Sequence, residues 1–244
     1  MRGACSIFLA LLFSVMLLAT FNSLSVRAEP STGGWSKTYG RTGEDEAYAL
    51  VQTSDGGYAL AGSTYPSGGG NSDAWLVKTD ANGDAQWNNT YGGTAMDEAW
   101  ALVQTSDGGY ALAGETQSFG SGGRDFWLVK TDSNGEMQWN KTYGGTGDDW
   151  AQALVQTGDG SYALAGGTAS FGAGLGDFWL VKTDVSGNTQ WNKTYGGTST
   201  GWALALVQTS DGGYALAGKT QSFGSGGGDF WLVKTVSNGE TQWN

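Results

Sequence analysis

The chain repeats one pattern of apolar and polar residues four times. In the second copy three stretches are largely apolar, ALVQT, YALAG and FWLVK, while a fourth, QWNKTYGG, alternates apolar with polar residues. Glycine-rich turns separate these stretches, and none of them has the period of 3.6 residues that marks an amphipathic helix. The pattern predicts an all-β fold with four strands per copy, in the second copy at residues 100–105, 110–116, 125–131 and 138–144.

The apolar stretches indicate how the strands of one copy are covered. Strands that are buried on both faces are apolar throughout, whereas strands with one solvated face alternate. Blades stacked around an axis cover each other in this way, and the small residues of YALAG suit the crowding near that axis. Each copy therefore predicts one four-stranded blade of a β-propeller, with the alternating strand at the outer edge.

Tryptophans at a spacing of 52 residues mark the start of each copy. A period of this size is typical of stacked or circular repeat architectures. The copies cover residues 35–86, 87–138, 139–190 and 191–242, in a single domain at residues 29–244, and they begin at Trp35, Trp87, Trp139 and Trp191, with a fifth start at Trp243. We expect the N-terminal outer strand to complete the last blade and close a ring of four, because closure removes an open sheet edge. Two alternatives stay open: a part of a larger propeller, or two chains in a larger ring, so that the protein is a monomer or a homodimer.

Residues 1–28 have the features of a signal peptide. Arg2 precedes an apolar run at residues 4–21, and the small residues Val26 and Ala28 suit cleavage before Glu29. The run is also long enough to remain as an uncleaved N-terminal anchor. Both interpretations predict a secreted or cell-surface protein that has no other membrane contact.

Composition excludes several kinds of chemistry. The chain has no histidine, and its one cysteine, Cys5, lies in the leader, which removes Ser-His-Asp and Cys-His catalysis and histidine-bound zinc. The net charge is −11, without a basic cluster, and loss of Arg2 and Arg27 with the leader makes it more negative. Nucleic acid is a poor partner for such a field, while cations and neutral glycans are acceptable ones. No cofactor other than calcium is expected.

Two turn motifs recur in the copies. The turn at residues 53–58, T-S-D-G-G-Y, resembles the Asp-box of sialidase-like propellers, and the segment at residues 80–87, which ends in Gln86 and Trp87, is similar to the tryptophan-docking motif of quinoprotein propellers. The resemblances imply structural roles: a fastened hairpin in the first case, and a tryptophan packed between blades in the second.

The longer connections share one rim if consecutive strands are antiparallel. Long loops on a rigid scaffold commonly carry binding sites. The loops between copies hold an arc of carboxylates, and three tryptophans lie at the start of the first strand of a copy. The candidate ligand-binding residues are Asp45, Glu46, Asp97, Glu98, Asp148, Asp149, Trp100, Trp150 and Trp202.

Carboxylate oxygens are the ligands that calcium prefers, so Asp45, Asp97 and Asp149 are candidate calcium ligands, although the D-x-D-x-D-G loop is absent. The alternative is that these carboxylates are solvated turn residues. Three N-x-T sequons form one column of the outer strand and are candidate glycosylation sites of an exported protein: Asn88, Asn140 and Asn192.

The strings W-N-K-T-Y-G-G and D-G-G-Y-A-L-A-G, with their long period, resemble the tandem propeller-repeat proteins of archaeal and bacterial cell surfaces, and more loosely the kelch repeats. The resemblance implies an exported β-propeller and little about its ligand. Because an active site needs distinct residues and the copies are nearly identical, we expect no enzyme but an extracellular binding module for a glycan or a protein. Two alternatives stay open: a glycan hydrolase or lyase with carboxylates from different blades, and a structural surface-layer repeat.

Overall fold

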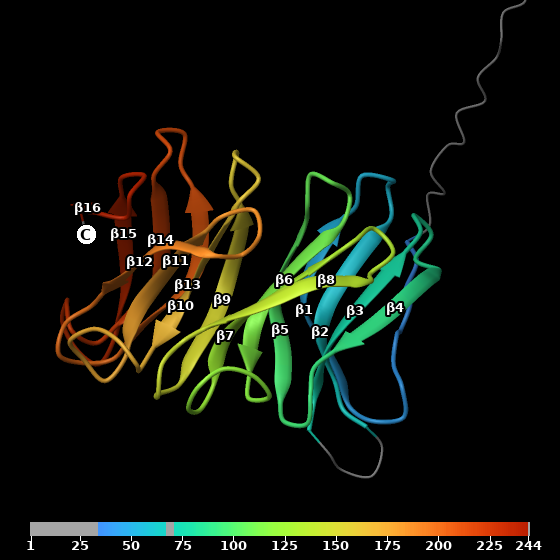
Figure 1. Ribbon diagram of the computed structural model, residues 1–244, viewed down its shortest axis with the longest axis horizontal. Coiled ribbons are helices and arrows are strands. Elements are labelled where there is room, and N and C mark those ends of the chain that lie inside the picture. Colours follow the sequence, from blue (N-terminus) through green and yellow to red (C-terminus); the bar gives the residue numbers. More distant parts are fainter. Residues whose placement is uncertain (1–33, 67–70, 244) are drawn as a thin grey trace, which may run out of the picture. The chain divides into compact units, whose positions relative to one another are not determined.

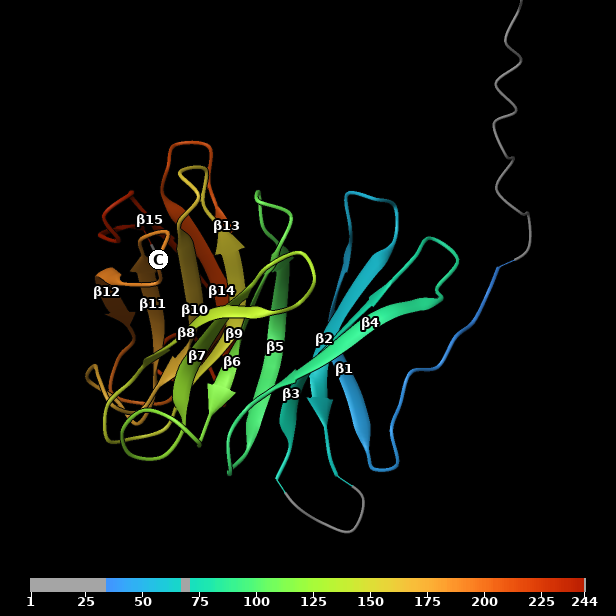
Figure 2. The same ribbon diagram turned by 45° about the vertical axis from the view of Figure 1, so that its right-hand side comes forward.

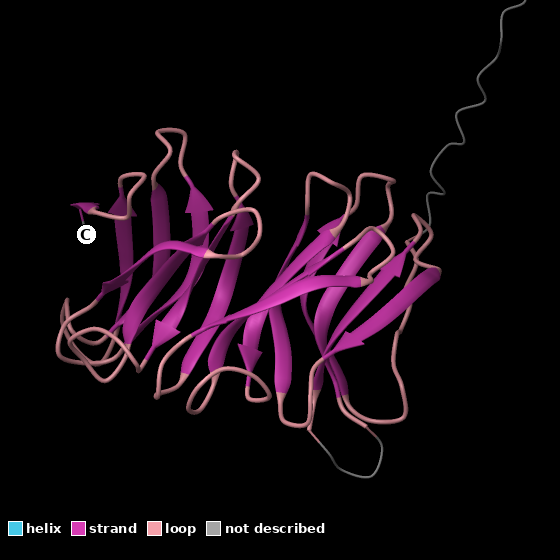
Figure 3. Ribbon diagram, in the orientation of Figure 1, coloured by secondary structure: helices cyan, strands magenta, loops and turns pink. Residues whose placement is uncertain are grey.

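The computed structural model describes residues 34–66 and 71–243. Within the chain, Trp35–Asn244 form one compact unit that is distinct from Met1–Gly34. The expected leader and its cleavage site lie outside the described residues. The unit is all-β, as the sequence predicts (Figure 3), and none of the described segments is an apolar helix of membrane-spanning length.

The strands form four antiparallel sheets, each of four strands in chain order, β1-β2-β3-β4 and onward. The first contains β1 (Asp45–Gln52), β2 (Tyr58–Thr64), β3 (Asp73–Thr79) and β4 (Ala85–Tyr91). The second contains β5 (Asp97–Gln104), β6 (Tyr110–Thr116), β7 (Asp125–Thr131) and β8 (Met137–Tyr143). The third contains β9 (Asp149–Gln156), β10 (Tyr162–Thr168), β11 (Asp177–Thr183) and β12 (Thr189–Tyr195). The fourth contains β13 (Gly201–Gln208), β14 (Tyr214–Thr220), β15 (Asp229–Thr235) and β16 (Thr241–Trp243).

The predicted strands agree closely with the observed ones. In the second copy β6 and β7 have the expected bounds, and β8 is displaced by one residue. The first strand, β5, begins three residues earlier than expected, at Asp97. The reason is a β-bulge at Trp100, which lets the chain resume its pairing with β6 from Ala99 to Asp97.

The core lies in the seams between successive sheets. The innermost strand of each sheet packs on the three inner strands of the sheet before it, as β5 does on β1, β2 and β3. Leu76 and Trp127, from two neighbouring sheets, belong to one buried cluster, and the two later seams repeat this arrangement. The apolar runs are therefore explained by cover on both faces.

Each outer strand also binds the sheet that follows it. The indole of Trp87 on β4 packs edge-on against the ring of Tyr110 on β6, with centroids 5.6 Å apart. Tyr91 donates its hydroxyl hydrogen to the carbonyl oxygen of Gly135 at 2.7 Å. A Cβ atom at Gly135 would lie 2.5 Å from the Trp87 ring, so this turn requires glycine. The predicted tryptophan between blades is confirmed.

The aspartate turns are fastened hairpins. Asp107 accepts hydrogen bonds from the Thr105 hydroxyl at 2.5 Å, from the amide of Gly109 at 3.0 Å and from the Lys130 ammonium at 2.8 Å. Burial opposes ionisation of Asp107, but these bonds outweigh it and lower its pKa to about 2. The same turn recurs in every sheet, where it fastens the inner hairpin.

The predicted closure of the ring by the N-terminal strand is not found. Among the described residues the fourth sheet packs on the third, and no comparable packing joins it to the first (Figures 1 and 2). β15 pairs with β16 only at Lys234 and Thr235. Residues 35–41 instead bind the first sheet, where Tyr39 donates to the carbonyl oxygen of Gly83 at 2.7 Å. The arrangement is that of successive propeller-like blades in an open array.

Candidate functional site

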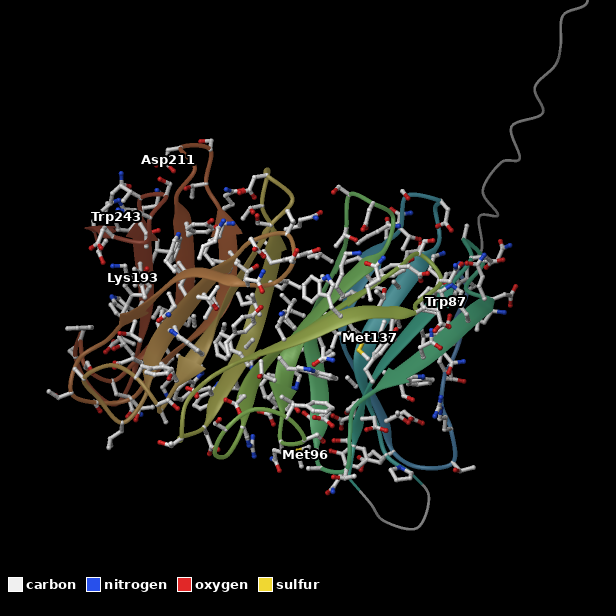
Figure 4. All side chains as sticks on the ribbon, viewed as in Figure 1. Trp87, Met96, Met137, Lys193, Asp211 and Trp243 are labelled. Carbon is white, nitrogen blue, oxygen red and sulfur yellow. The ribbon has the colours of Figure 1, made fainter. Side chains whose placement is uncertain are left out.

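The longer connections lie at one rim of the sheets. In the second sheet, Thr116 at the end of β6 pairs with Asp97 at the start of β5 and with Asp125 at the start of β7. Figure 4 shows Met96, next to the start of β5, at the end of the molecule opposite to Asp211, which lies in a hairpin turn. The antiparallel register thus confirms the predicted shared rim.

Four positions that change chemical character between copies lie together at this rim. They are the second residue of the inner strand, its bulge residue, the last residue but one of the second strand, and the residue before the third strand. From the first sheet to the fourth, the second residue of the inner strand is Glu46, Glu98, Trp150 and Trp202, and the bulge residue is Tyr48, Trp100, Gln152 and Leu204. The last residue but one of the second strand is Ser63, Glu115, Gly167 and Lys219. The residue before the third strand is Ser72, Arg124, Gly176 and Gly228. The framework is repeated while these side chains are not, so the rim is the candidate functional site.

Glu98 is the most bonded side chain of this site. It is buried, and one carboxylate oxygen, Oε2, accepts the indole N–H of Trp100 at 3.0 Å. Its other oxygen accepts the hydroxyl groups of Tyr65 at 3.2 Å and of Ser72 at 3.4 Å, both from the first sheet. Glu98 therefore joins two sheets and fixes the half-buried Trp100, which the β-bulge turns out of the regular alternation.

Glu115 lies beside Glu98, as its cross-strand partner on β6. Only 1% of Glu115 is exposed, and its carboxylate lies 3.0 Å from the Arg124 guanidinium. The guanidinium donates a hydrogen bond to Oε2 of Glu115, while Oε1 is buried without a hydrogen bond. Burial raises the pKa of Glu115 to about 7; Arg124 lowers it, and Glu98 and Asp148 raise it further. Near neutral pH the Glu115 carboxyl group can therefore donate or accept a proton, and the nearby charges decide which form is favoured.

Aromatic side chains continue the site on the third and fourth sheets. The indole of Trp150 lies on Gly167, where an added Cβ would be 2.7 Å from the ring and 3.0 Å from Cβ of Trp202. The Lys219 ammonium lies over the Trp202 ring, 5.5 Å from its centroid. Both indoles are half-buried. Trp150 and Trp202 share a repeat position with Glu98, whereas Trp100 is a bulge residue, so the three predicted tryptophans do not form one column.

The candidate calcium ligands are not brought together. Asp97 is fully buried and accepts the amide of Gly93 at 2.8 Å and the hydroxyl of Ser118 at 2.6 Å. Asp149 and Asp45 cap the loops before β9 and β1 in the same manner. No group of three acidic residues suited to a metal occurs in the described part of the chain. Asp97 and Asp149 lie at different seams and Asp45 lies on the first sheet, so calcium binding there stays a prediction.

The two remaining carboxylates of the predicted arc are exposed at the rim. Asp148 accepts the backbone N–H of Arg124 at 3.0 Å, and Glu46 accepts the hydroxyl of Tyr48. Asp148 therefore lies at the edge of the group formed by Glu98, Glu115 and Arg124. Glu46 lies on the first sheet, where it is the repeat equivalent of Glu98 but remains open to solvent.

The sequon asparagines hold core tryptophans. Oδ1 of Asn140 on β8 accepts the indole N–H of Trp127 at 3.3 Å, and the other two do the same in their sheets: Asn88 for Trp75 and Asn192 for Trp179. The bond uses Oδ1 and not Nδ2, the atom that carries a glycan. Glycosylation stays a prediction.

Sequence reasoning missed Glu115, Arg124 and Lys219, which we find beside the predicted residues. It treated the near identity of the copies as evidence against a site and did not compare them position by position. That comparison holds the signal, because the same backbone position is Glu115 in one sheet, Gly167 in the next and Lys219 in the last.

No family model matches the chain. A curated relative, the regulatory protein FlaEY of Caulobacter vibrioides, is 27% identical over 187 residues, which are 66% of this chain and 19% of that protein. A solved structure of a bifunctional GH43-CE protein from Bacteroides eggerthii matches 83% of this chain and 26% of its own chain, at 16% identity and a TM-score of 0.44. The chain spans about a fifth of the first protein and about a quarter of the second.

The expectation that the protein is not an enzyme is corrected, because its premise fails: the copies are not alike at the rim that holds Glu98 and Glu115. The solved structure that the chain matches is a bifunctional GH43-CE protein. At this TM-score the match says nothing about the activity of this chain. The resemblance to kelch and Asp-box repeats is not accompanied by a family match.

Proposed function

We propose that this protein is an exported module that binds a glycan at the rim of its second sheet, around Glu98, Trp100, Glu115 and Arg124. The observation that carries the proposal is the difference between copies. The third sheet adopts the same fold with Trp150 and Gly167 at the positions of Glu98 and Glu115. Burying two carboxyl groups is costly. Since the fold does not require them, their presence is best explained by a ligand.

A glycan suits the side chains that border this site. Trp100 offers a half-buried aromatic face, and Arg124, whose side chain is 42% exposed, offers planar hydrogen-bond donors. Asp148 adds an exposed acceptor. Sites of this kind combine an apolar surface with a few fixed polar groups. The net charge of −11 disfavours polyanionic ligands, so a neutral or cationic sugar polymer is the expected class.

A second candidate function is cleavage of a glycosidic bond, favoured by the pairing of Glu98 with Glu115. Directly opposed residues in an antiparallel pair have Cβ atoms about 4.5 to 5.5 Å apart. Retaining glycosidases place two carboxyl groups about 5 to 5.5 Å apart and keep one of them protonated. The pKa of Glu115, raised to about 7 by burial, suits the acid. The pair lies within one blade, whereas the pattern of the sequence predicts carboxylates from different blades.

The test is a glycan array screen followed by titration calorimetry of the strongest ligand. The double variant Glu98→Trp/Glu115→Gly gives the second sheet the residues that the third already carries, so it should fold and lose binding. Ser106→Gly, which copies Gly158 at the opposite rim, is the matched control and should bind normally. Equal binding by the double variant and the control would refute the site.

Hydrolysis is tested by incubating the bound glycan with the protein and measuring new reducing ends. Glu115→Gln should abolish their release if Glu115 is the acid, while binding persists. Release that is unaffected by both Glu115→Gln and Glu98→Gln would exclude this pair as the catalytic carboxyl groups.

A further inference from the structure

The first and last sheets expose the two halves of one kind of interface. Phe230 on the last sheet is fully exposed, whereas Phe126 and Phe178, at the same repeat position, are 0% exposed. Leu50 on the first sheet is 62% exposed, whereas its repeat equivalents are 6 to 7% exposed: Leu102, Leu154 and Leu206. The interior residues are buried because each faces the neighbouring sheet. The exposed residues of the two end faces are therefore the repeat equivalents of residues that pack on each other in the interior seams.

The interior seams show which rings would meet. A phenylalanine of one sheet packs on a tryptophan of the next, with centroids 4.6 and 4.7 Å apart: Phe126 on Trp179, and Phe178 on Trp231. By repeat position, Phe230 would pack on Trp75. Trp75 lines a cavity of about 280 Å³ on the first sheet, with Leu60, Val77 and residues 37–39. The last sheet has an apolar hollow of about 440 Å³ lined by Leu204, Ala217, Phe230 and Leu232.

Each interior seam also contains two hydrogen bonds, and the equivalent groups at the two ends make no such bond among the described residues. The amide of Ser106 donates to Oε1 of Gln156 on the next sheet at 2.8 Å, and the amide of Asp149 donates to the carbonyl oxygen of Arg124 at 2.7 Å. The other two seams repeat both bonds. The equivalent pairs across the end faces are Ser210 with Gln52, and Asp45 with Gly228.

The outer strand of the last sheet is incomplete in the described part of the chain, and a matching strand lies at the other end. β11 pairs with β12 from Phe178 to Thr183, but β15 pairs with β16 only at Lys234 and Thr235. Residues 35–41 occupy, on the first sheet, the place that an outer strand of a preceding blade would take. Tyr39 and Trp35 bind Gly83 and Tyr58 as Tyr91 and Trp87 bind Gly135 and Tyr110. Trp35 and Trp243 share one repeat position, so only one of the two indoles can pack on Tyr58 where the two ends meet.

Charge at the rim matches across the same two faces. In the third seam, Gly167 lies against Trp202 of the next sheet. The equivalent pair at the end faces is Lys219 on the last sheet and Glu46 on the first, which carry opposite charges and are both accessible. The variable rim is thus complementary at this junction as well.

We propose that the last sheet of one copy docks on the first sheet of a second copy of this chain, with residues 36–41 of the second copy continuing the outer strand that β16 begins. The contact is head to tail, so it closes into a ring if the rotation per copy permits and otherwise extends into a filament. It buries the exposed apolar faces and covers an open sheet edge.

Mass measurement by sedimentation velocity over a range of concentrations tests this contact. The protein should form discrete dimers or a series of higher multiples. Phe230→Asp should raise the dissociation constant at least about tenfold, because a carboxylate then enters the apolar seam. Leu175→Asp is the matched control, since Leu175 is 80% exposed but lies in a rim loop, and it should associate normally. A monomer at every concentration, or equal association by both variants, would overturn the proposal.

A charge exchange tests the register of the contact. Lys219→Glu and Glu46→Lys should each weaken association, because each places like charges at the junction. The double variant restores opposite charges and should restore most of the association. Association that is unchanged in both single variants, or a double variant weaker than either, would show that Lys219 and Glu46 do not meet, and so refute the proposed register.

Discussion

Glu98 and Glu115 face each other across β5 and β6 with both carboxyl groups buried, and only one of them is paired with a guanidinium. In the other sheets the same two positions hold Glu46 and Ser63, Trp150 and Gly167, or Trp202 and Lys219. A pair of acids at this place is therefore a property of the second sheet and not of the blade. Its protonation should be visible in stability.

Stability should fall as pH rises from about 4.5 to 7 because of Glu115. Burial raises its pKa from the usual value of 4.5 to about 7, so the folded state keeps the proton where the unfolded state loses it. The stabilisation of the folded state by protonated Glu115 is fully present below pH 4.5 and is lost as pH rises to about 7, with an upper limit of about 3 kcal/mol. Glu115→Gln should remove this slope. Denaturation midpoints between pH 4 and 8 check it, and parallel curves for the two proteins would contradict it.

Trp100→Gln should weaken glycan binding about tenfold without unfolding the protein, because it removes an aromatic surface worth about 1 kcal/mol or more. Gln152 occupies the equivalent bulge in the third sheet, so the backbone accepts glutamine there. Calorimetry measures the loss. The control is Gln152→Leu, which copies Leu204, and an equal loss in both would point to a general effect on the rim.

Asp107→Asn should destabilise the protein more than Asp159→Asn does. Asp107 binds the buried Lys130 ammonium at 2.8 Å, whereas Asp159 lies 3.6 Å from that of Lys182. With both carboxylates more than half exposed, we expect about 1 to 2 kcal/mol for Asp107 and about half of that for Asp159. Chemical denaturation at pH 7 measures the difference. Because the pKa of Asp107 is lowered to about 2, the loss should vanish as pH falls from 4 to 2.

Trp139→Ala should cost about 2 kcal/mol or more, and Trp243→Ala less than about 0.5 kcal/mol. Trp139 packs on Tyr162 of the next sheet, with centroids 5.8 Å apart, whereas Trp243 is 54% exposed on the last sheet. The comparison keeps the residue type and the strand position constant. Similar costs measured by denaturation of the monomer would mean that the seam contact contributes little.

The strands and seams could be predicted because local chemistry repeats with them. Glycine turns separate apolar runs, and those runs need cover on both faces, so β6 and β7 were placed to the residue. The start of β5 was missed because a bulge at Trp100 is a matter of pairing with β6 and leaves no mark in the apolar pattern. The arc of carboxylates was recognised as acidic, but Asp97 and Asp149 are loop caps, which only their hydrogen bonds show.

The sequence by itself determined the all-β class, the four sheets, the tryptophans between them and the rim on which the long loops lie, because each depends on residues close together or on a period of the chain. The tertiary structure decided that Glu98 and Glu115 form a buried pair beside Arg124, since cross-strand register joins residues that are far apart in sequence. It also decided that the array is open at Leu50 and Phe230. Closure depends on how far each sheet rotates from the one before it, and that rotation results from packing across whole seams.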